Sequence, residues 1–581
     1  MFNPLLIHYG FYPFCYAINS STLCIRAKTY KDSLDKIIIH YINLYDHSGN
    51  MLHKEMDIQL TDSLYAMYET AIQIKEKRFK YYFELIKASK SAFYTSDGLV
   101  KSPMTNNYFY FPFINDDDII SLPQWAEGEI IYQIIIDRFF DGNPDNNPEH
   151  VRPWGTLPNR STYYGGDFEG IIKKLDYLAD LGVKIIYLSP VFKSPSYHKY
   201  DISNFYQIED IYGGIDGLKK LVHKVHEKGM KIVLDGVFNH CSSEHQFFQD
   251  LLLNNELSFF KDFFEVYSYP VSIEEGNYNN FGNLVPKMPK FNTSNDRVID
   301  YLSEQAIYWL MELDIDGYRL DVADEISHKF WRYFRQTLKS KKKDIILIGE
   351  IWNKASAWLK GDELDTATNY KFRQYLFEFV KGEISSLKFI NLIQANLMDY
   401  ASVQSNYLVN LIGSHDTVRS ITELNQEKTH YLTLMVMLLF PGMPLIYYGD
   451  EVGLEGDKDP DNRRAMLWKK SLSIDEILIR KLAKYRSQSD TLKKGATKFF
   501  ATGDRVLCFK RTWNDESLLV VANFGEKIVS INMKDLELLM GNAAKTLTGY
   551  DIEVLEIALF KLDVPTKLEN IKGEKINEKN C

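Results

Sequence analysis

The sequence predicts an α/β protein built around a (β/α)8 TIM barrel with an inserted subdomain after its third strand, an N-terminal β-sandwich and a C-terminal β-sandwich. Three observations support this prediction. Short apolar runs alternate with amphipathic helical patterns through the middle of the chain. The regions before and after show the alternation of polar and apolar residues that is typical of strands. The chain has 581 residues, which is enough for several domains.

The composition excludes several classes of protein. The net charge is −10 and no long basic run occurs, so neither nucleic acid nor an anionic membrane is expected as a partner. No apolar run reaches the ~18–20 residues that a membrane span needs. The five cysteines show no CxxC spacing, so neither a disulfide framework nor a zinc site is expected. The N-terminus lacks the pattern of a signal peptide, and we expect a cytoplasmic protein.

The N-terminal region, residues 1–122, is expected to form a β-sandwich. Segments such as "TLCIRAKTY" and "DKIIIHYINLY" alternate polar and apolar residues and are separated by turn residues. The region shows no sustained alternation of strand and helix patterns. It therefore predicts a mostly β module.

The central region, residues 123–489, contains eight apolar runs with helical patterns such as "GLKKLVHKVHEKG" between them. Eight such units in succession favour a closed barrel over a doubly wound sheet, which is the alternative. The runs are "IIYQIII" (130–136), "KIIYLS" (184–189), "KIVLDG" (231–236), "DGYRLD" (316–321), "DIILIGE" (344–350), a weak "LDTATN" (364–369), "LVNLIG" (408–413) and "LIYYGD" (445–450).

Two further segments complete the predicted architecture. Residues 240–290 are rich in Phe and Tyr and are too many for an ordinary loop, so a small subdomain is expected after the third strand. Residues 490–581 return to strand patterns such as "RVLCFKRTW" and "SLLVVANFG", which predicts the C-terminal β-sandwich. The last polar residues are expected to be frayed.

Polar side chains follow four of the predicted strands. The third is followed by "DGVFNH", the fourth contains Arg319 and Asp321, the fifth ends at Glu350, and the seventh runs into "GSHDT". Alternate residues of a strand point to one face, so Arg319 and Asp321 point the same way. An aspartate at a strand end often caps the next helix, and an isolated glutamate often forms an ion pair. Because barrel chemistry lies at the carboxyl ends of the strands, these residues taken together indicate an active site.

These motifs carry a family resemblance. "DGVFNH", "GYRLDVADE", "GEIW" and "LIGSHDT" resemble, in order, the four signature regions of the α-amylase family of glycoside hydrolases. "MPKFN" (288–292) resembles a fifth region that is typical of the neopullulanase, cyclomaltodextrinase and maltogenic amylase subgroup. The resemblance extends over nearly the whole chain. Two positions depart from the subgroup pattern: Asp324 replaces the usual Asn and bears on acceptor preference, and Asn462 replaces a common Cys.

The resemblance implies a role for each matching residue. Asp321 would be the nucleophile, Glu350 the general acid/base and Asp416 a second carboxylate that binds sugar hydroxyl groups. Tyr200 would stack on the sugar at the cleavage site, where His240 and His415 would form hydrogen bonds. The full set of implied substrate-binding residues is Tyr200, His240, Arg319, His415, Glu325, Trp352, Asp459 and Arg463.

These roles require different protonation states of the two reacting carboxyl groups. A nucleophile must be ionised, and the cation of Arg319 is expected to lower the pKa of Asp321. Glu350 is expected to stay protonated until it donates to the leaving oxygen. Attack by Asp321 would form a glycosyl-enzyme, which water or a sugar hydroxyl would then release with retention of configuration.

A loop after the first strand, "DGNPDNNP" (141–148), is dense in oxygen ligands of the kind that Ca²⁺ prefers. The alternative is a polar turn, because Asn, Asp, Gly and Pro are also turn formers. The resemblance implies a structural calcium site. Its ligands would be Asp141, Asn143, Asn146, Asn147, Gly165 and Asp167.

The predicted function is that of a retaining hydrolase that cleaves α-1,4-glucosidic bonds of cyclodextrins, maltooligosaccharides and pullulan. A non-catalytic amylase-like binding or assembly protein and an enzyme that is mainly a 4-α-glucanotransferase are the alternatives. The N-terminal module resembles one that dimerises in this subgroup, so a homodimer is expected. A starch-binding module on a monomer is the other interpretation of residues 1–122.

Overall fold

The computed structural model describes residues 4–531, 536–545 and 550–562. The chain forms two compact units. The first comprises Met1–Leu122 with Lys354–Glu363 and Leu387–Ser405, and the second comprises Pro123–Asn353, Leu364–Ser386 and Asn406–Cys581. The tail that the sequence predicts to be frayed lies outside the described residues, as does Cys581. The other four cysteines are buried free thiols.

The second unit contains the predicted barrel. Its parallel sheet has eight strands in the order β20-β19-β18-β15-β12-β11-β22-β21, and a parallel bridge between Thr368 and Val409 joins the two ends. The expected α/β barrel is therefore confirmed. The strands are β11 (Ile131–Ile134), β12 (Ile185–Leu188), β15 (Lys231–Gly236), β18 (Gly317–Leu320), β19 (Ile346–Gly349), β20 (Thr366–Ala367), β21 (Val409–Leu411) and β22 (Met443–Tyr447).

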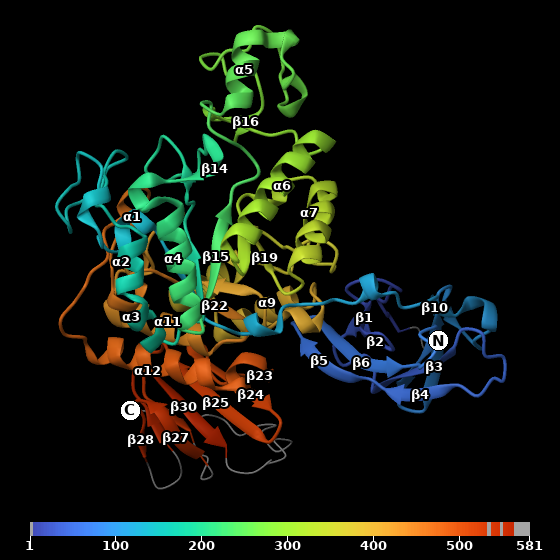
Figure 1. Cartoon of the computed structure of the whole chain (residues 1–581). Helices are drawn as coiled ribbons and strands as arrows, with labels where there is room; N and C mark the ends of the chain where they lie inside the picture. Colours follow the sequence, from blue (N-terminus) through green and yellow to red (C-terminus); the bar gives the residue numbers. More distant parts are fainter. Residues whose placement is uncertain (1–3, 532–535, 546–549, 563–581) are drawn as a thin grey trace. The chain divides into compact units, whose positions relative to one another are not determined.

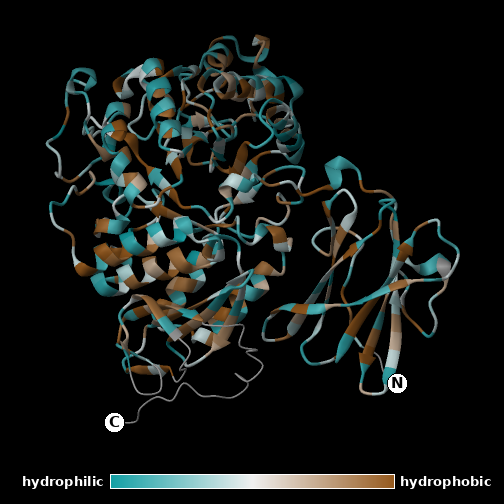
Figure 2. Cartoon of the chain, turned by 60° about the horizontal axis from the view of Figure 1, so that its bottom comes forward, coloured by the Kyte–Doolittle hydropathy of each residue, from teal (hydrophilic) through white to brown (hydrophobic). Residues whose placement is uncertain are grey.

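Amphipathic helices cover the barrel, and Figure 2 shows apolar and polar segments alternating along them. In α4 the apolar residues recur at helical spacing, so that Leu218, Leu221, Val222 and Val225 are buried on one side. The helices are α1 (Ile136–Phe139), α2 (Phe168–Lys173), α3 (Leu175–Asp180), α4 (Gly214–Glu227), α6 (Asp296–Leu313), α7 (His328–Lys341), α8 (Tyr370–Val380), α10 (Ser420–Leu424), α11 (Glu427–Leu439), α12 (Ile474–Gln488) and α13 (Asp490–Lys494).

The expected alternation of strand and helix fails at one place. The connection from β19 to β20, residues 350–365, is fully described and contains no helix. Part of it, Lys354–Glu363, belongs to the first compact unit instead. β20 is also the shortest strand of the barrel, with two residues, and it arises from the run whose apolar pattern is weakest in the sequence.

The register of two central strands brings polar residues together. β15 pairs with β18 so that Asp235 lies beside Arg319. Directly opposed residues in neighbouring strands point to the same face of the sheet. The register therefore directs a carboxylate and a guanidinium into the same part of the barrel.

A subdomain is inserted between β15 and α6. It contains α5 (Gln246–Asn254) and a short hairpin of β16 (Asn280–Phe281) with β17 (Val285–Pro289). Figure 1 shows this insertion, in green, beyond the end of β14 (Asn204–Ile208), which pairs with β13 (Phe192–Lys193). An isolated bridge pairs His240 with Lys290, so the two ends of the insertion meet beside the strand-end residues.

The first unit is a β-sandwich. One sheet has the order β1-β2-β6-β5 and the other β4-β3-β7-β8-β9, with β10 paired to β7. Ile25 and Tyr68 of the first sheet share a core with Ile37 and Phe83 of the second. The strands are β1 (Cys15–Asn19), β2 (Thr22–Tyr30), β3 (Lys36–Asn43), β4 (Leu52–Glu55), β5 (Asp57–Thr61), β6 (Tyr65–Gln73), β7 (Phe79–Lys87), β8 (Lys90–Thr95), β9 (Gly98–Val100) and β10 (Phe109–Phe111). The unit also includes most of α9 (Ser386–Leu397).

The C-terminal region is a second sandwich, within the second unit. A five-stranded sheet, β23-β24-β25-β30-β27, and a three-stranded sheet, β26-β29-β28, share one core. Within the described residues, no helix is long and apolar enough to cross a membrane. The strands are β23 (Ala496–Ala501), β24 (Val506–Trp513), β25 (Glu516–Asn523), β26 (Val529–Ile531), β27 (Leu536–Gly541), β28 (Ala544–Lys545), β29 (Tyr550–Ile552) and β30 (Glu556–Leu562).

Candidate active site

One guanidinium group lies at the centre of the polar cluster. Nη1 of Arg319 is 2.7 Å from Oδ1 of Asp321 and 3.0 Å from Oδ1 of Asp235. Nη2 is 2.9 Å from Oε1 of Glu350. All four side chains are buried. The structure thus brings the predicted nucleophile and the predicted acid together on a single cation, with a third carboxylate beside them.

The charges in this cluster do not balance. Three carboxyl groups share one guanidinium, and burial disfavours the charged form of each acid. Burial raises the pKa of Asp321 well above its ordinary value; Arg319 opposes this shift, while Glu350 and Asp235 add to it. The expected effect of Arg319 on Asp321 agrees in sign with the contribution of this cation, but burial outweighs it, so the net shift of the Asp321 pKa is upward.

The two oxygens of Glu350 are held by different donors. Oε2 accepts the backbone N–H of Val322 at 2.9 Å, and Oε1 accepts Nε1–H of Trp352 at 3.3 Å. Val322 has φ +46°. A β-branched residue in this left-handed region is strained, at a cost of about 1–3 kcal/mol. The strained backbone directs an N–H group at the carboxyl group of Glu350.

A network of neutral groups lies behind the carboxylates. The hydroxyl of Tyr200 donates to Oδ2 of Asp235 at 2.9 Å, so at 2.7 Å it accepts from Nε2–H of His415. The side-chain amide of Gln133 donates to Nδ1 of His415 at 2.7 Å, which fixes this tautomer. Burial lowers the pKa of His415 well below its ordinary value, and the charges of Arg319 and Arg463 lower it further. His415 is therefore a neutral hydrogen-bonding group.

The third predicted carboxylate is more accessible. The Asp416 side chain is 32% exposed, so an incoming molecule can reach it. Nη2 of Arg463 is 3.5 Å from Oδ1 of Asp416, and Nη1 is 3.2 Å from Oδ1 of Asp459. Nε of Arg463 also donates to the carbonyl of His415 at 3.0 Å. These four predicted residues therefore form one cluster.

His240 has a nitrogen atom that is left without a hydrogen bond. Its side chain is buried, and among the described residues Nε2 has no hydrogen-bond partner. Burial lowers the pKa of His240 to about 3, aided by His198 and Lys290. Its ring lies 5.0 Å from the ring of Phe281 of the insertion. A neutral imidazole with an unsatisfied nitrogen is suited to bind a hydroxyl group.

Two other predicted binding residues are exposed. Trp352 stacks on Tyr370 with ring centroids 3.9 Å apart, which leaves its outer face open to solvent. Glu325 pairs with Lys290 of the insertion at 2.6 Å. Its neighbour Asp324, where the sequence departs from the subgroup pattern, is exposed. The structure gives Glu325 a partner on the insertion, a contact that the sequence did not predict.

The structure adds three residues to this site that were not predicted to act in it. Tyr187 donates to Asp235 at 2.6 Å, and Gln133 orients His415. Asn462, for which no consequence was expected, donates to the carbonyls of His415 and Thr417 at 2.7 and 2.9 Å. A signal existed for Tyr187 and Gln133, because a polar residue in an otherwise apolar barrel strand points to a site. Asp235, which begins the strand-end motif "DGVFNH", binds Arg319.

The acidic loop after β11 contains unsatisfied oxygens. The Oδ1 atoms of Asp141, Asn146 and Asn147 are buried and have no hydrogen-bond partner in the part of the chain that the structure describes. Gly165 has φ +80°, and a Cβ there would lie 2.2 Å from Oδ1 of Asn147, so only glycine fits. Three buried side-chain oxygens without hydrogen bonds, together with the nearby Gly165 backbone, suit a hard cation.

The two remaining side chains of the predicted set are already engaged. Asp167 caps α2 by accepting the N–H of Gly170 at 2.6 Å, and Asn143 accepts the N–H of Asp145 at 3.4 Å. Within the described residues, no group of three or more His, Cys, Asp or Glu side chains is arranged to hold a metal. A cation here would therefore depend largely on amide and backbone oxygens.

Comparisons with known proteins agree with this geometry. The family described as "Alpha amylase, catalytic domain" matches residues 133–500, and "Alpha amylase, N-terminal ig-like domain" matches residues 1–115. The chain is 38% identical to a cyclomaltodextrinase of Thermoanaerobacter pseudethanolicus, covering 92% of this chain and 95% of that protein. It is 34% identical to an intracellular maltogenic amylase of Bacillus subtilis, covering 91% and 92%. A solved cyclomaltodextrinase structure matches with TM-score 0.89 at 32% identity, covering 96% of this chain and 99% of the other.

Proposed function

Because the chain belongs to the α-amylase family of glycoside hydrolases, we propose that it cleaves α-1,4-glucosidic bonds of cyclodextrins, maltooligosaccharides and pullulan. The observation that carries this proposal is the Arg319 guanidinium bonded to both Asp321 and Glu350. A retaining glycosidase needs two carboxyl groups close together, about 5–5.5 Å apart. A single guanidinium group that bonds to both carboxyl groups supports such a separation.

The mechanism requires Glu350 to carry a proton while Asp321, held by Arg319, is ionised and attacks the anomeric carbon. Glu350 donates its proton to the leaving oxygen, and the bond between sugar and leaving group breaks. In the second step Glu350 takes a proton from water, whose oxygen displaces Asp321 from the sugar. Two displacements retain the α configuration, which proton NMR of the first products measures directly.

The surrounding groups would hold the sugar in place. His240, His415 and Asp416 offer hydrogen bonds to hydroxyl groups, and Asp459 and Arg463 extend the same cluster. The exposed face of Trp352, whose indole N–H bonds to Glu350, offers a binding surface for a sugar next to the general acid. A sugar acceptor bound there would compete with water for the glycosyl-enzyme, which is how a 4-α-glucanotransferase activity would arise. A non-catalytic role is disfavoured because all three carboxylates are present.

Three further properties form part of the proposal. Ca²⁺ bound by Asp141, Asn146, Asn147 and the Gly165 backbone would supply rigidity to the loop after β11, and the three unsatisfied oxygens support this. A cytoplasmic location is supported by the printed name of the intracellular relative. A homodimer is also part of the proposal, and the exposed, stacked rings of Tyr9 and Phe11 offer an apolar surface for it.

We predict that Asp321→Asn lowers kcat on β-cyclodextrin by several orders of magnitude, because the amide cannot form the glycosyl-enzyme. The measurement is single-turnover and steady-state kinetics beside the wild type, on β-cyclodextrin, pullulan and soluble starch. Asp515→Asn, at an exposed carboxylate of the C-terminal sandwich, is the control and should keep wild-type rates. A folded Asp321→Asn enzyme with near-normal kcat would refute the assignment.

For calcium, we expect a chelator to lower the melting temperature more than it lowers kcat at moderate temperature, because a ligand of the folded state stabilises it by mass action. Asn147→Ala should abolish the response to the chelator. Asn159→Ala, at a residue outside the predicted set whose side chain caps a turn by accepting the N–H of Ser161, is the matched control and should leave the response intact. A melting temperature indifferent to chelator, in protein that contains no calcium by metal analysis, counts against the site.

For the dimer, we expect kcat/KM on β-cyclodextrin to be well above that on soluble starch, because a second subunit near the site would hinder a branched polymer. Phe11→Ser should weaken dimerisation in sedimentation experiments and narrow this gap. Tyr45→Ser, at a residue that is 70% exposed on the same unit, is the control. A monomeric wild type that prefers starch would favour the starch-binding interpretation of residues 1–122 instead.

A further inference from the structure

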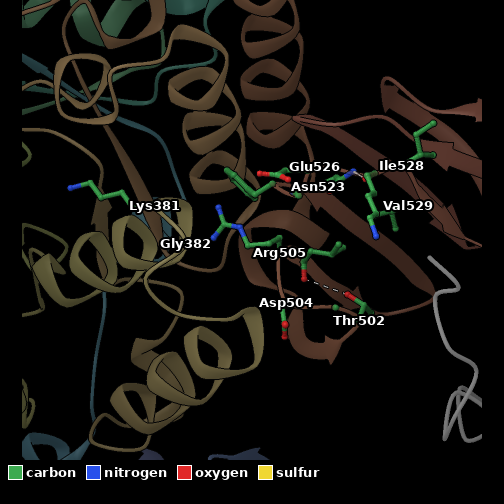
Figure 3. A pocket seen from close by; sticks show the side chains of 14 residues that line it. Lys381, Gly382, Thr502, Asp504, Arg505, Asn523, Glu526, Ile528 and Val529 are labelled. Carbon is green, nitrogen blue, oxygen red and sulfur yellow. Dashed lines mark hydrogen bonds between the residues drawn. The ribbon is translucent and has the colours of Figure 1, made fainter. Parts of the chain in front are cut away.

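Two cavities lie outside the cluster around Arg319. The larger, of about 430 Å³, is lined by residues such as Arg505, Asn523 and Lys381 (Figure 3). Its central polar groups already have protein partners. Arg505 donates to the carbonyls of Phe379 and Val380, and the amide of Asn523 donates to the carbonyl of Lys527 at 2.8 Å. The polar groups that line this cavity therefore have a structural role, because they bond to other groups of the protein.

The second cavity, of about 300 Å³, has a different lining. Four aromatic side chains form most of its wall: Phe140, Trp154, Tyr164 and Trp468. Asp141 and Arg152 add a carboxylate and a guanidinium. A concave site with aromatic walls and a few polar groups has the composition of a small-molecule site.

The aromatic walls are fixed in place. Nε1–H of Trp154 donates to the carbonyl of Met466 at 2.9 Å, and that of Trp468 donates to the carbonyl of Phe139 at 2.8 Å. Trp154 packs edge-on against Tyr164 at 6.0 Å. Trp154 remains 37% exposed, so an incoming molecule can reach its ring. Rings that are already oriented cost little conformational entropy when they bind a ligand.

The cavity is linked to the cluster around Arg463. Trp468 ends the segment that carries Asp459 and Arg463, and the loop carrying Trp154 also carries Arg160, which lies 3.7 Å from Asp459. The segment from Asp459 to Trp468 and the loop that carries Trp154 therefore line both the aromatic cavity and the cluster around Arg463. A ligand that extends beyond Asp459 has a built surface along which it can continue.

We propose that this aromatic cavity binds a glucosyl unit of an α-glucan away from the point of cleavage, an inference that rests on the proposed function. The apolar face of the sugar ring would stack on Trp154, and its hydroxyl groups would bond to Arg152. Amphipathic aromatic side chains suit a ligand with one apolar face and a polar edge. The volume admits a single sugar ring, so the site would act on long chains or large rings.

The first test is binding by calorimetry in a Glu350→Gln background, which prevents turnover. Maltoheptaose should bind about fivefold more weakly when Trp154→Ala is added. Trp154→Phe should restore most of the affinity. Trp513→Ala, at an exposed tryptophan on β24, is the matched control. Equal affinities of the Trp154→Ala and parent proteins for maltoheptaose would overturn the proposal.

The second test separates this proposal from the proposed function. Trp154→Ala in the active enzyme should raise KM for maltoheptaose about fivefold, with kcat and the rate on p-nitrophenyl-α-maltoside unchanged. If the wild type cleaves maltoheptaose and Trp154→Ala cleaves it with the same KM, this inference alone is wrong. If the wild type cleaves no α-glucan, the proposed function itself is wrong.

Discussion

The site depends on one electrostatic constraint: a single buried guanidinium, that of Arg319, binds Asp235, Asp321 and Glu350. Burial raises the pKa values of Asp321 and Asp235, while the charge of Arg319 lowers them. The same cation holds the nucleophile and the acid next to each other. The strained backbone of Val322 then fixes one oxygen of Glu350.

The neighbouring groups are consistent with this constraint. His240 and His415 are neutral because burial and nearby cations lower their pKa values. Neutral imidazoles bind hydroxyl groups without adding positive charge near Arg319. Additional positive charge there would weaken the ion pairs between Arg319 and the carboxylates. Asp416, by contrast, is paired with Arg463 and remains partly exposed, so it can meet a sugar directly.

Much of this arrangement could be predicted from the sequence, and the exceptions have physical reasons. The apolar runs predicted the eight barrel strands, and the strand-end motifs predicted residues that the structure brings together. The role of Asn462 depends on carbonyls more than forty residues away in the chain, which no local pattern reveals. The strain at Val322 is a property of the backbone. The sequence predicted the effect of Arg319 on Asp321, but the larger, opposite effect of burial on that pKa depends on packing that no sequence pattern reveals.

The central claim is tested most directly by Arg319→Met, with melting temperatures measured at pH 5 and pH 8. Without the cation, the folded-state pKa values of Asp235 and Asp321 rise further above their unfolded values, so the folded state binds more protons and gains stability as pH falls. We predict a loss of about 3–5 kcal/mol at pH 8 and a clearly smaller loss at pH 5. Arg464→Met, at a partly exposed ion pair, should show no such dependence. An equal loss for Arg319→Met at both pH values would contradict the account.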